Sequence, residues 1–322
     1  MNDHEENVRR EFEEKEGITD TKVKDLGTVE PHRTARVQAD DPEIRRLNEL
    51  TGYVKLDLSL LPSGGRFYRE DFEIHIRAAR TAEIRDFSMM DEGSIHDADT
   101  RLNSILSSCS RVMYKVQRGS YKDILEGDRI YIILSIRELT FKEGEFKLMM
   151  PIKNGCDTAG CKSQETMELR TNTLQFQEED DSLAKFYNEE TKGYEIQTKS
   201  HGTIPMAPPT IGVMRAVSEY GREQEETGTA WDRSLAAILP YIHREWRGLS
   251  NKEIFAQISQ LQGWSSTKYS IAYRIAERMT VAVKPQMIYP CDGCGDEVTV
   301  PLTFPGGIKG LFVIHDIDSE LL

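Results

Sequence analysis

Four of the five cysteines form two close pairs, and these pairs are the residues of the sequence best suited to chemistry. Cys156 and Cys161 have four residues between them, and Cys291 and Cys294 have two. Structural zinc needs four tetrahedral ligands, usually thiolates or imidazoles, and each pair supplies only two. We therefore predict one shared structural Zn²⁺ site built from all four cysteines, which joins two distant parts of the chain.

The second pair has the local sequence of a zinc knuckle. Residues 290–295 read Pro-Cys-Asp-Gly-Cys-Gly, and glycine permits the tight turn in which backbone amides face the sulfur atoms. The first pair is wider, a spacing that zinc sites tolerate but that is less diagnostic. Cys109 stands alone at the helical spacing of Leu102, Ile105 and Leu106, which indicates a small core residue.

Two other uses of the cysteines remain open. A redox dithiol at Cys291 and Cys294 is expected at the N-terminus of a helix, whereas an alternating strand pattern follows this pair at 298–304. A zinc ribbon that regulates nucleic acid needs basic surroundings. Asp292 and Asp296 make the surroundings of the second pair acidic instead.

The elements that must position the cysteines follow from the hydrophobic periodicity. Apolar residues alternate over 146–152 and resume at 167–169, on either side of the first pair, and they alternate again after the second pair. A period of two is typical of strands, so each pair is expected within a β-hairpin. Further patterns predict strands over 54–60 and 72–76, helices over 41–52, 102–113, 129–139, 213–220, 231–246, 250–261 and 267–279, and a charged loop over 221–228.

The order of these elements repeats along the chain, with a cysteine pair near the end of each repeat. We predict an α+β fold of two similar helix-rich halves, each ending in a β-hairpin, joined by a zinc-ribbon-like four-cysteine site. The expected domains are an acidic N-terminal arm with a short helix at 1–50, a first half at 51–176 and a second half at 177–322. Residues 1–40 contain 7 Lys and Arg against 11 Asp and Glu, and such a segment is expected to be ordered only by docking.

Composition and motifs exclude several classes of function. The 322 residues carry a net charge of −13, with 38% apolar and 30% charged residues, which is the composition of a soluble globular protein. We expect no membrane segment, because no apolar run is long enough to span a bilayer, and no nucleic acid partner, because the chain is acidic without a basic stripe. The sequence lacks a phosphate-binding loop, a Gly-x-Ser-x-Gly turn and a His-Glu-x-x-His motif. We therefore expect no enzyme activity.

A turn between the two predicted strands is the remaining candidate site. Pro62 favours a turn, and two glycines permit positive φ angles. The simpler interpretation is a hairpin connection. The alternative is a docking loop in which Phe67 or Tyr68 anchors a partner, since aromatic side chains dominate interface energetics. The residues of this loop are Pro62, Ser63, Gly64, Gly65, Arg66, Phe67 and Tyr68.

Several short motifs together resemble one protein family. A Leu-Pro-Ser-x-Gly-x-x-Tyr-type turn at 61–68 is followed by a strand and by a helical block whose buried helix begins Gly127-Asp128-Arg129. A cysteine pair, a second helical block and a second cysteine pair come next. Over residues 54–304 this order resembles the baseplate hub assembly proteins of T4-like contractile-tailed bacteriophages.

The resemblance implies a non-enzymatic protein that helps to build the tail baseplate through contacts with other tail proteins. It implies localisation in the virion tail baseplate and in the host cytoplasm during assembly, and several copies around the tail axis. A transient assembly chaperone that is absent from the virion remains the main alternative. The family's cysteine pairs correspond to Cys156, Cys161, Cys291 and Cys294, and the wider first pair is the point of departure from the family.

Overall fold

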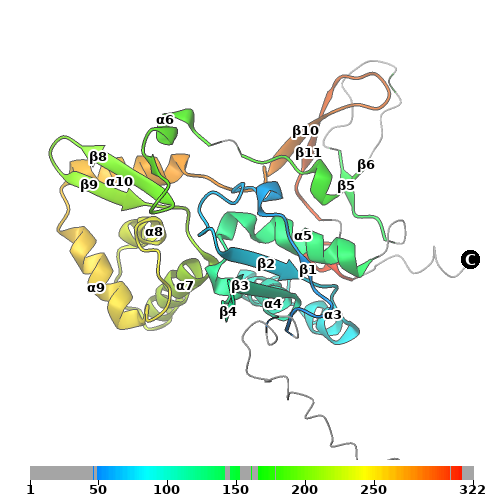
Figure 1. Cartoon of the computed structure of the whole chain (residues 1–322), viewed down its shortest axis with the longest axis horizontal. Helices are drawn as coiled ribbons and strands as arrows, with labels where there is room; N and C mark the ends of the chain where they lie inside the picture. Colours follow the sequence, from blue (N-terminus) through cyan, green and yellow to red (C-terminus); the bar gives the residue numbers. More distant parts are fainter. Residues whose placement is uncertain are drawn as a thin grey trace, which may run out of the picture. The chain divides into compact units, whose positions relative to one another are not determined.

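The computed structural model describes residues 46, 49–141, 146–152, 161, 166–177, 179–304 and 306–313. Residues 46–322 form one compact unit of mixed helices and strands (Figure 1). The fold class is α+β, as predicted. The predicted arm at 1–40 and most of the helix expected over 41–52 lie outside the described residues.

Eleven strands in the described part of the chain form four antiparallel sheets, with strand orders β1-β2-β3-β4, β5-β6, β7-β8-β9 and β10-β11. The strands are β1 (Val54–Lys55), β2 (Phe72–Ile76), β3 (Ser110–Tyr114), β4 (Gln117–Arg118), β5 (Met149–Pro151), β6 (Thr166–Glu168), β7 (Tyr187–Asn188), β8 (Gly193–Thr198), β9 (Gly202–Met206), β10 (Gln286–Pro290) and β11 (Glu297–Pro301). The α-helices are α3 (Thr81–Ser88), α4 (Ile95–Cys109), α5 (Arg129–Thr140), α6 (Asp181–Ala184), α7 (Ile211–Glu226), α8 (Arg233–Ile242), α9 (Asn251–Gln262) and α10 (Ser266–Arg278).

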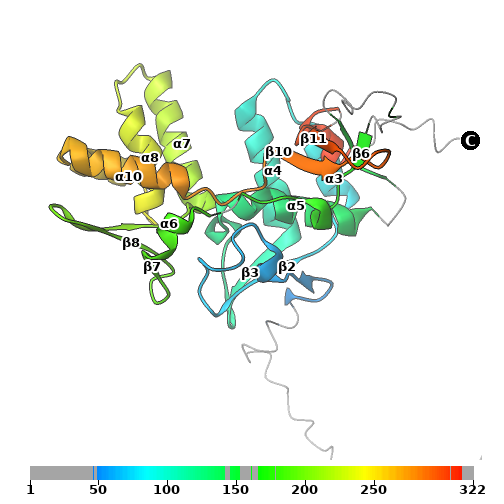
Figure 2. The ribbon, with the colours of Figure 1, turned by 90° about the horizontal axis from the view of Figure 1, so that it is seen from above.

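These elements gather in three groups within the compact unit. The β1–β4 sheet lies with α3, α4 and α5, and the β7–β9 sheet lies with α7–α10 (Figures 1 and 2). The hairpins β5–β6 and β10–β11 lie side by side in both views, and β5 packs against β11. Helix α5 is buried nearly all round, as its apolar sequence predicted.

Two segments of the first half differ from the sequence prediction. The strand expected over 54–60 ends at Lys55, because the Asp57 side chain accepts a hydrogen bond from Ser59 N and starts the 3₁₀ turn η1 (Leu58–Leu60). The helix expected over 102–113 ends at Cys109. Met113 therefore lies on β3, which pairs with β2 as the central strands of the sheet.

Two segments of the second half also differ. The charged loop expected over 221–228 is the last part of α7, which continues to Glu226. Glycine suits position 221 because the Trp231 ring packs closely against the helix there. A Cβ atom at this position would lie only 2.6 Å from the ring. The helix expected over 231–246 is shorter, since α8 covers only Arg233–Ile242, with Pro240 inside it.

Short backbone contacts connect the residues before and after position 176. Leu125 forms an isolated β-bridge with Thr210, and Phe176 forms another with Val283. At Gly127 a Cβ atom would lie only 1.6 Å from the Val281 carbonyl oxygen, so this close approach requires glycine. The division into two similar halves at 51–176 and 177–322 stays a prediction.

Candidate metal centre

The turn between β10 and β11 holds the second cysteine pair. Cys291 N donates to the Asp296 carbonyl oxygen at 2.6 Å, and Gly295 N donates to the Cys291 carbonyl oxygen at 2.8 Å. Gly295 has a φ of +80°, a conformation that side chains disfavour. The strand pairing on either side, from Pro290–Glu297 to Gln286–Pro301, fixes the ends of this turn.

Three cysteines from the two hairpins converge. The sulfur atoms of Cys161, Cys291 and Cys294 all lie within 4.8 Å of one another, and the Cys161 Sγ to Cys291 Sγ distance is 3.7 Å. Two thiolates on one tetrahedral zinc at about 2.3 Å each would be about 3.8 Å apart. A disulfide would bring the sulfurs to about 2.05 Å. The geometry of this pair therefore fits ligands of a common ion, and Cys156 lies outside the described residues.

Core packing and a side-chain hydrogen bond fix the β10–β11 hairpin. Met287, Val298 and Val300 are buried, so one face of the hairpin is anchored in the core. Gln175 connects this hairpin to the segment that follows β6, since its Oε1 accepts from Ile288 N at 3.0 Å. Cys291 is buried, Cys161 is half-buried and Cys294 is exposed, so an ion could reach the cluster from solvent.

The fifth cysteine has a different environment. Cys109 is fully buried at the end of α4, and burial raises the pKa of its thiol to about 12. Its Sγ lies 3.6 Å from Glu83 Oε2 and 3.7 Å from Arg77 Nη1. A thiol with so high a pKa is a poor ligand and a poor nucleophile, and the prediction that Cys109 is a core residue is confirmed.

Three side chains of the 62–68 loop, those of Ser63, Phe67 and Tyr68, are buried. Phe67 and Tyr68 are each only 5% exposed. The Phe67 ring packs against Tyr187 and Tyr194 at centroid distances of 5.8 and 5.6 Å, and Tyr68 stacks on Phe72 at 4.2 Å. The expected role of the two aromatics as anchors for a partner therefore finds no support in this conformation.

Asp128 is the residue that holds this loop in place. Its carboxylate accepts from Ser63 N at 2.9 Å, from Ser63 Oγ at 2.7 Å and from Tyr68 OH at 2.7 Å, while Leu125 N donates to Tyr68 OH at 3.0 Å. We call Ser63, Tyr68, Leu125 and Asp128 the Asp128 network. Burial raises the pKa of Asp128 to about 6, and the hydrogen bonds from Ser63 and Tyr68 partly oppose that rise.

Sequence reasoning missed three buried charges at the ends of α5, which are Asp128, Arg129 and Arg137. Asp128 is fully buried and Arg137 is 8% exposed. Both lie in or beside a stretch that is otherwise apolar on every side. A charged residue inside such a stretch must itself be buried, and this signal could have identified Arg137.

Comparison of the chain with protein-family models, with curated proteins and with solved structures finds no match. None of the helices in the described part of the chain combines the length and apolarity that a membrane span requires.

Proposed function

We propose that this chain is a structural, non-enzymatic protein of a contractile phage tail baseplate, and that it acts through contacts with other tail proteins. The proposal begins from the resemblance carried by the 61–68 turn and by Gly127-Asp128-Arg129. It is supported by one observation: these two short motifs meet in the Asp128 network, although Ser63 and Asp128 are 65 residues apart. Two motifs whose residues contact each other are stronger support for the family's fold than two motifs that lie apart in the structure.

Each residue of the second motif has its own structural task. Gly127 permits the close approach to Val281, and Asp128 binds the 62–68 loop. Arg129 Nη1 donates to Asp99 Oδ1 at 2.6 Å from a side chain that is 7% exposed. This division of tasks supports the resemblance at the level of fold, and the assembly role follows from the family.

The test of the function is the location of the protein during tail assembly. Mass spectrometry of purified contractile-tail particles, and of baseplate intermediates from the host that carries the gene, should detect the chain in both. Detection in intermediates alone would favour the alternative of a transient assembly chaperone. Absence from both would overturn the proposal.

For the metal centre we propose one structural Zn²⁺ bound by Cys161, Cys291 and Cys294, with Cys156 as the fourth ligand. The 3.7 Å separation of the Cys161 and Cys291 sulfurs supports this ligand set. An ion at this position would cross-link the β5–β6 and β10–β11 hairpins and stabilise their contact. Structural zinc contributes roughly 10–16 kcal/mol of apparent binding free energy in small peptides, so its loss should loosen both hairpins.

Elemental analysis tests the zinc site separately from the biological role. The purified chain should contain about one zinc per molecule, and Cys291→Ser should lower that content severalfold because a structural site needs four ligands and would lose one thiolate. Cys109→Ala is the matched control and should keep its zinc, since Cys109 lies in the core. A wild-type content below about half a zinc per chain would contradict the proposal.

A further inference from the structure

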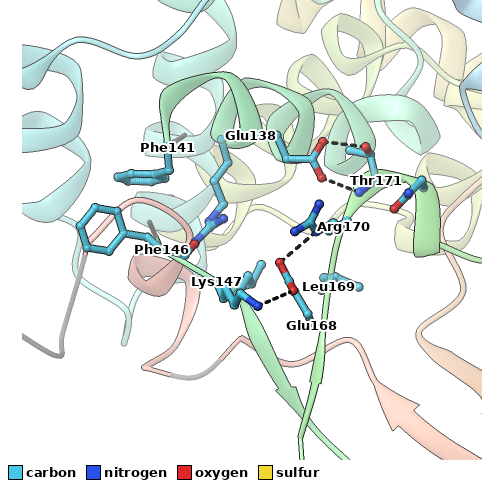
Figure 3. Close-up of a pocket in the computed structure, with 11 residues that line it drawn as sticks. Glu138, Phe141, Phe146, Lys147, Glu168, Leu169, Arg170 and Thr171 are labelled. Carbon is cyan, nitrogen blue, oxygen red and sulfur yellow. Dashed lines mark hydrogen bonds and ion pairs between the residues drawn. The ribbon is translucent and has the colours of Figure 1, made fainter. Parts of the chain in front are cut away.

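A cavity of about 310 Å³ lies beside the last turn of α5, at the base of the β5–β6 hairpin (Figure 3). The end of the helix supplies Arg137 and Glu138, and the chain on either side of the hairpin supplies most of the other walls. The remaining lining residues are Phe141, Phe146, Lys147, Leu148, Glu168, Leu169, Arg170, Thr171 and Asn172. We call this cavity the Arg137 pocket.

Both carboxylates of the pocket already have donors. Glu138 accepts from Thr171 N at 2.6 Å and from Thr171 Oγ1 at 2.7 Å. Glu168 accepts from Arg170 Nε at 2.9 Å and forms an ion pair with Lys147 Nζ at 3.3 Å (Figure 3). Neither carboxylate is within ion-pair distance of Arg137, and neither is any other carboxylate of the described residues.

Arg137 is consequently a buried cation with few partners. Its Nη2 donates to the Phe146 carbonyl oxygen at 2.7 Å, and its Nε is buried without a hydrogen-bond partner. The guanidinium carbon lies 5.1 Å from the centroid of the Phe141 ring. Burial lowers the pKa of Arg137, but a guanidinium stays charged in proteins. A buried charge is unfavourable without a close counter-ion, and the described residues place none within ion-pair distance of this guanidinium.

We infer that the Arg137 pocket binds a carboxylate attached to an apolar or aromatic group. The guanidinium presents planar, paired donors that match a carboxylate. The rings of Phe141 and Phe146, edge to face with centroids 5.3 Å apart, would contact the apolar part. The volume is at the lower end of ligand pockets, which suits a ligand the size of one amino-acid residue.

The charges of the pocket favour a carboxylate over a phosphate. Glu138 and Glu168 are near enough to act electrostatically on Arg137. Together with Arg137, Lys147 and Arg170 these two carboxylates give the pocket a net charge of +1, which one bound carboxylate would balance and a phosphate dianion would exceed. The chemistry therefore corresponds to the free C-terminus of a partner protein, or to one of its acidic side chains next to an apolar residue.

The first experiment uses the wild-type chain and NMR of the arginine Nε–H groups. Phenylacetate should shift the Arg137 Nε–H resonance, because a carboxylate bound at the guanidinium changes the electrostatic environment of that proton. Phenylacetamide, which has the same shape without the charge, should bind roughly tenfold to hundredfold more weakly. Equal binding of the two compounds, tighter binding of phenyl phosphate, or no shift at Arg137 would overturn the inference.

Variants then test the residue and the source of the carboxylate. Arg137→Met should abolish the preference for phenylacetate over phenylacetamide, whereas Lys147→Gln, which removes an exposed cation of the same pocket, should keep it. N-acetylphenylalanine against acetyl-Phe-Glu-amide distinguishes a terminal carboxylate from a side-chain one, and tighter binding of either supports the inference. A further outcome would also contradict the inference. If the probes bound only to the Glu143→Gln, Glu145→Gln double variant, one of these glutamates of the chain itself would be the partner of Arg137.

Discussion

The two ends of α5 carry buried charges with very different partners. At the start of the helix, Asp128 accepts three hydrogen bonds, two from Ser63 and one from Tyr68. In the last turn, Arg137 donates one, to the Phe146 carbonyl oxygen. The first arrangement is complete and stabilises the fold, whereas the second leaves donor capacity for a ligand. The comparison teaches that burial of a charge does not reveal its role until its partners are counted.

Removal of the Asp128 carboxylate should have the largest effect. Asp128→Ala leaves Ser63 N, Ser63 Oγ and Tyr68 OH buried without their acceptor, and each such group costs about 1–3 kcal/mol. We expect the free energy of unfolding to fall by about 3–5 kcal/mol in urea titrations. Glu70→Ala, at an exposed carboxylate, is the control and should change it by less than about 0.5 kcal/mol.

The pH dependence of stability should report the same carboxyl group. Its pKa is about 6 in the folded chain against an ordinary value of 3.8, so the folded chain holds this proton more tightly than the unfolded chain does. Raising the pH from about 4 to about 6 therefore favours unfolding, and the contribution of Asp128 to stability should fall by about 2–3 kcal/mol. The measurement is urea unfolding of wild type and Asp128→Asn at both ends of this range. Parallel pH profiles would show that Asp128 does not titrate there.

Removal of one hydroxyl from the Asp128 network should have a smaller effect. Tyr68→Phe takes one donor from Asp128 and leaves Leu125 N without its acceptor. We expect a loss of about 1–2 kcal/mol in the free energy of unfolding. Tyr241→Phe removes a hydroxyl outside the network and should cost less. An equal loss of unfolding free energy in both variants would mean that the Asp128 network does not contribute to stability beyond an ordinary tyrosine hydroxyl.

Removal of the charge at the other end of α5 should have the smallest effect on stability. Arg137→Met keeps much of the side-chain volume, loses one hydrogen bond and removes a buried charge that no described carboxylate pairs with. These contributions oppose each other, so the free energy of unfolding should change by less than about 1 kcal/mol in either direction. A loss as large as that of Asp128→Ala would show that Arg137 is a structural residue and would remove the contrast between the two ends.

Local patterns predicted much of the secondary structure. Residues 129–139 are apolar nearly all round, and they form the buried helix α5. Helix α9 covers Asn251–Gln262, close to the helix expected over 250–261, and Ser250 caps it by accepting from Glu253 N. The full length of α7 was not predictable. Gly221 suggested that the helix ends there, and its close packing against Trp231 cannot be read from the hydrophobic periodicity of the sequence.

The candidate sites also depend on long-range contacts that the sequence pattern does not reveal. The cysteine pairs predicted that four sulfurs would meet; Cys161, Cys291 and Cys294 do come together, and Cys156 lies outside the described residues. For the 62–68 loop the sequence left a simple connection and a docking loop open, and it did not indicate that Phe67 and Tyr68 are buried. Its Ser63 is buried only because Asp128, 65 residues later, supplies an acceptor. Long-range pairing of this kind leaves no periodic trace in the sequence.

The closeness of Cys161 and Cys291 has a consequence for the making of the protein. The two thiols are 130 residues apart. Ribosomes add about 5–20 residues per second, so on the order of 10 s separates the synthesis of the first from that of the second. An ion that requires both sulfurs can therefore be captured only when nearly the whole polypeptide has been translated. If the proposed ion is bound, prematurely terminated chains would lack its cross-link.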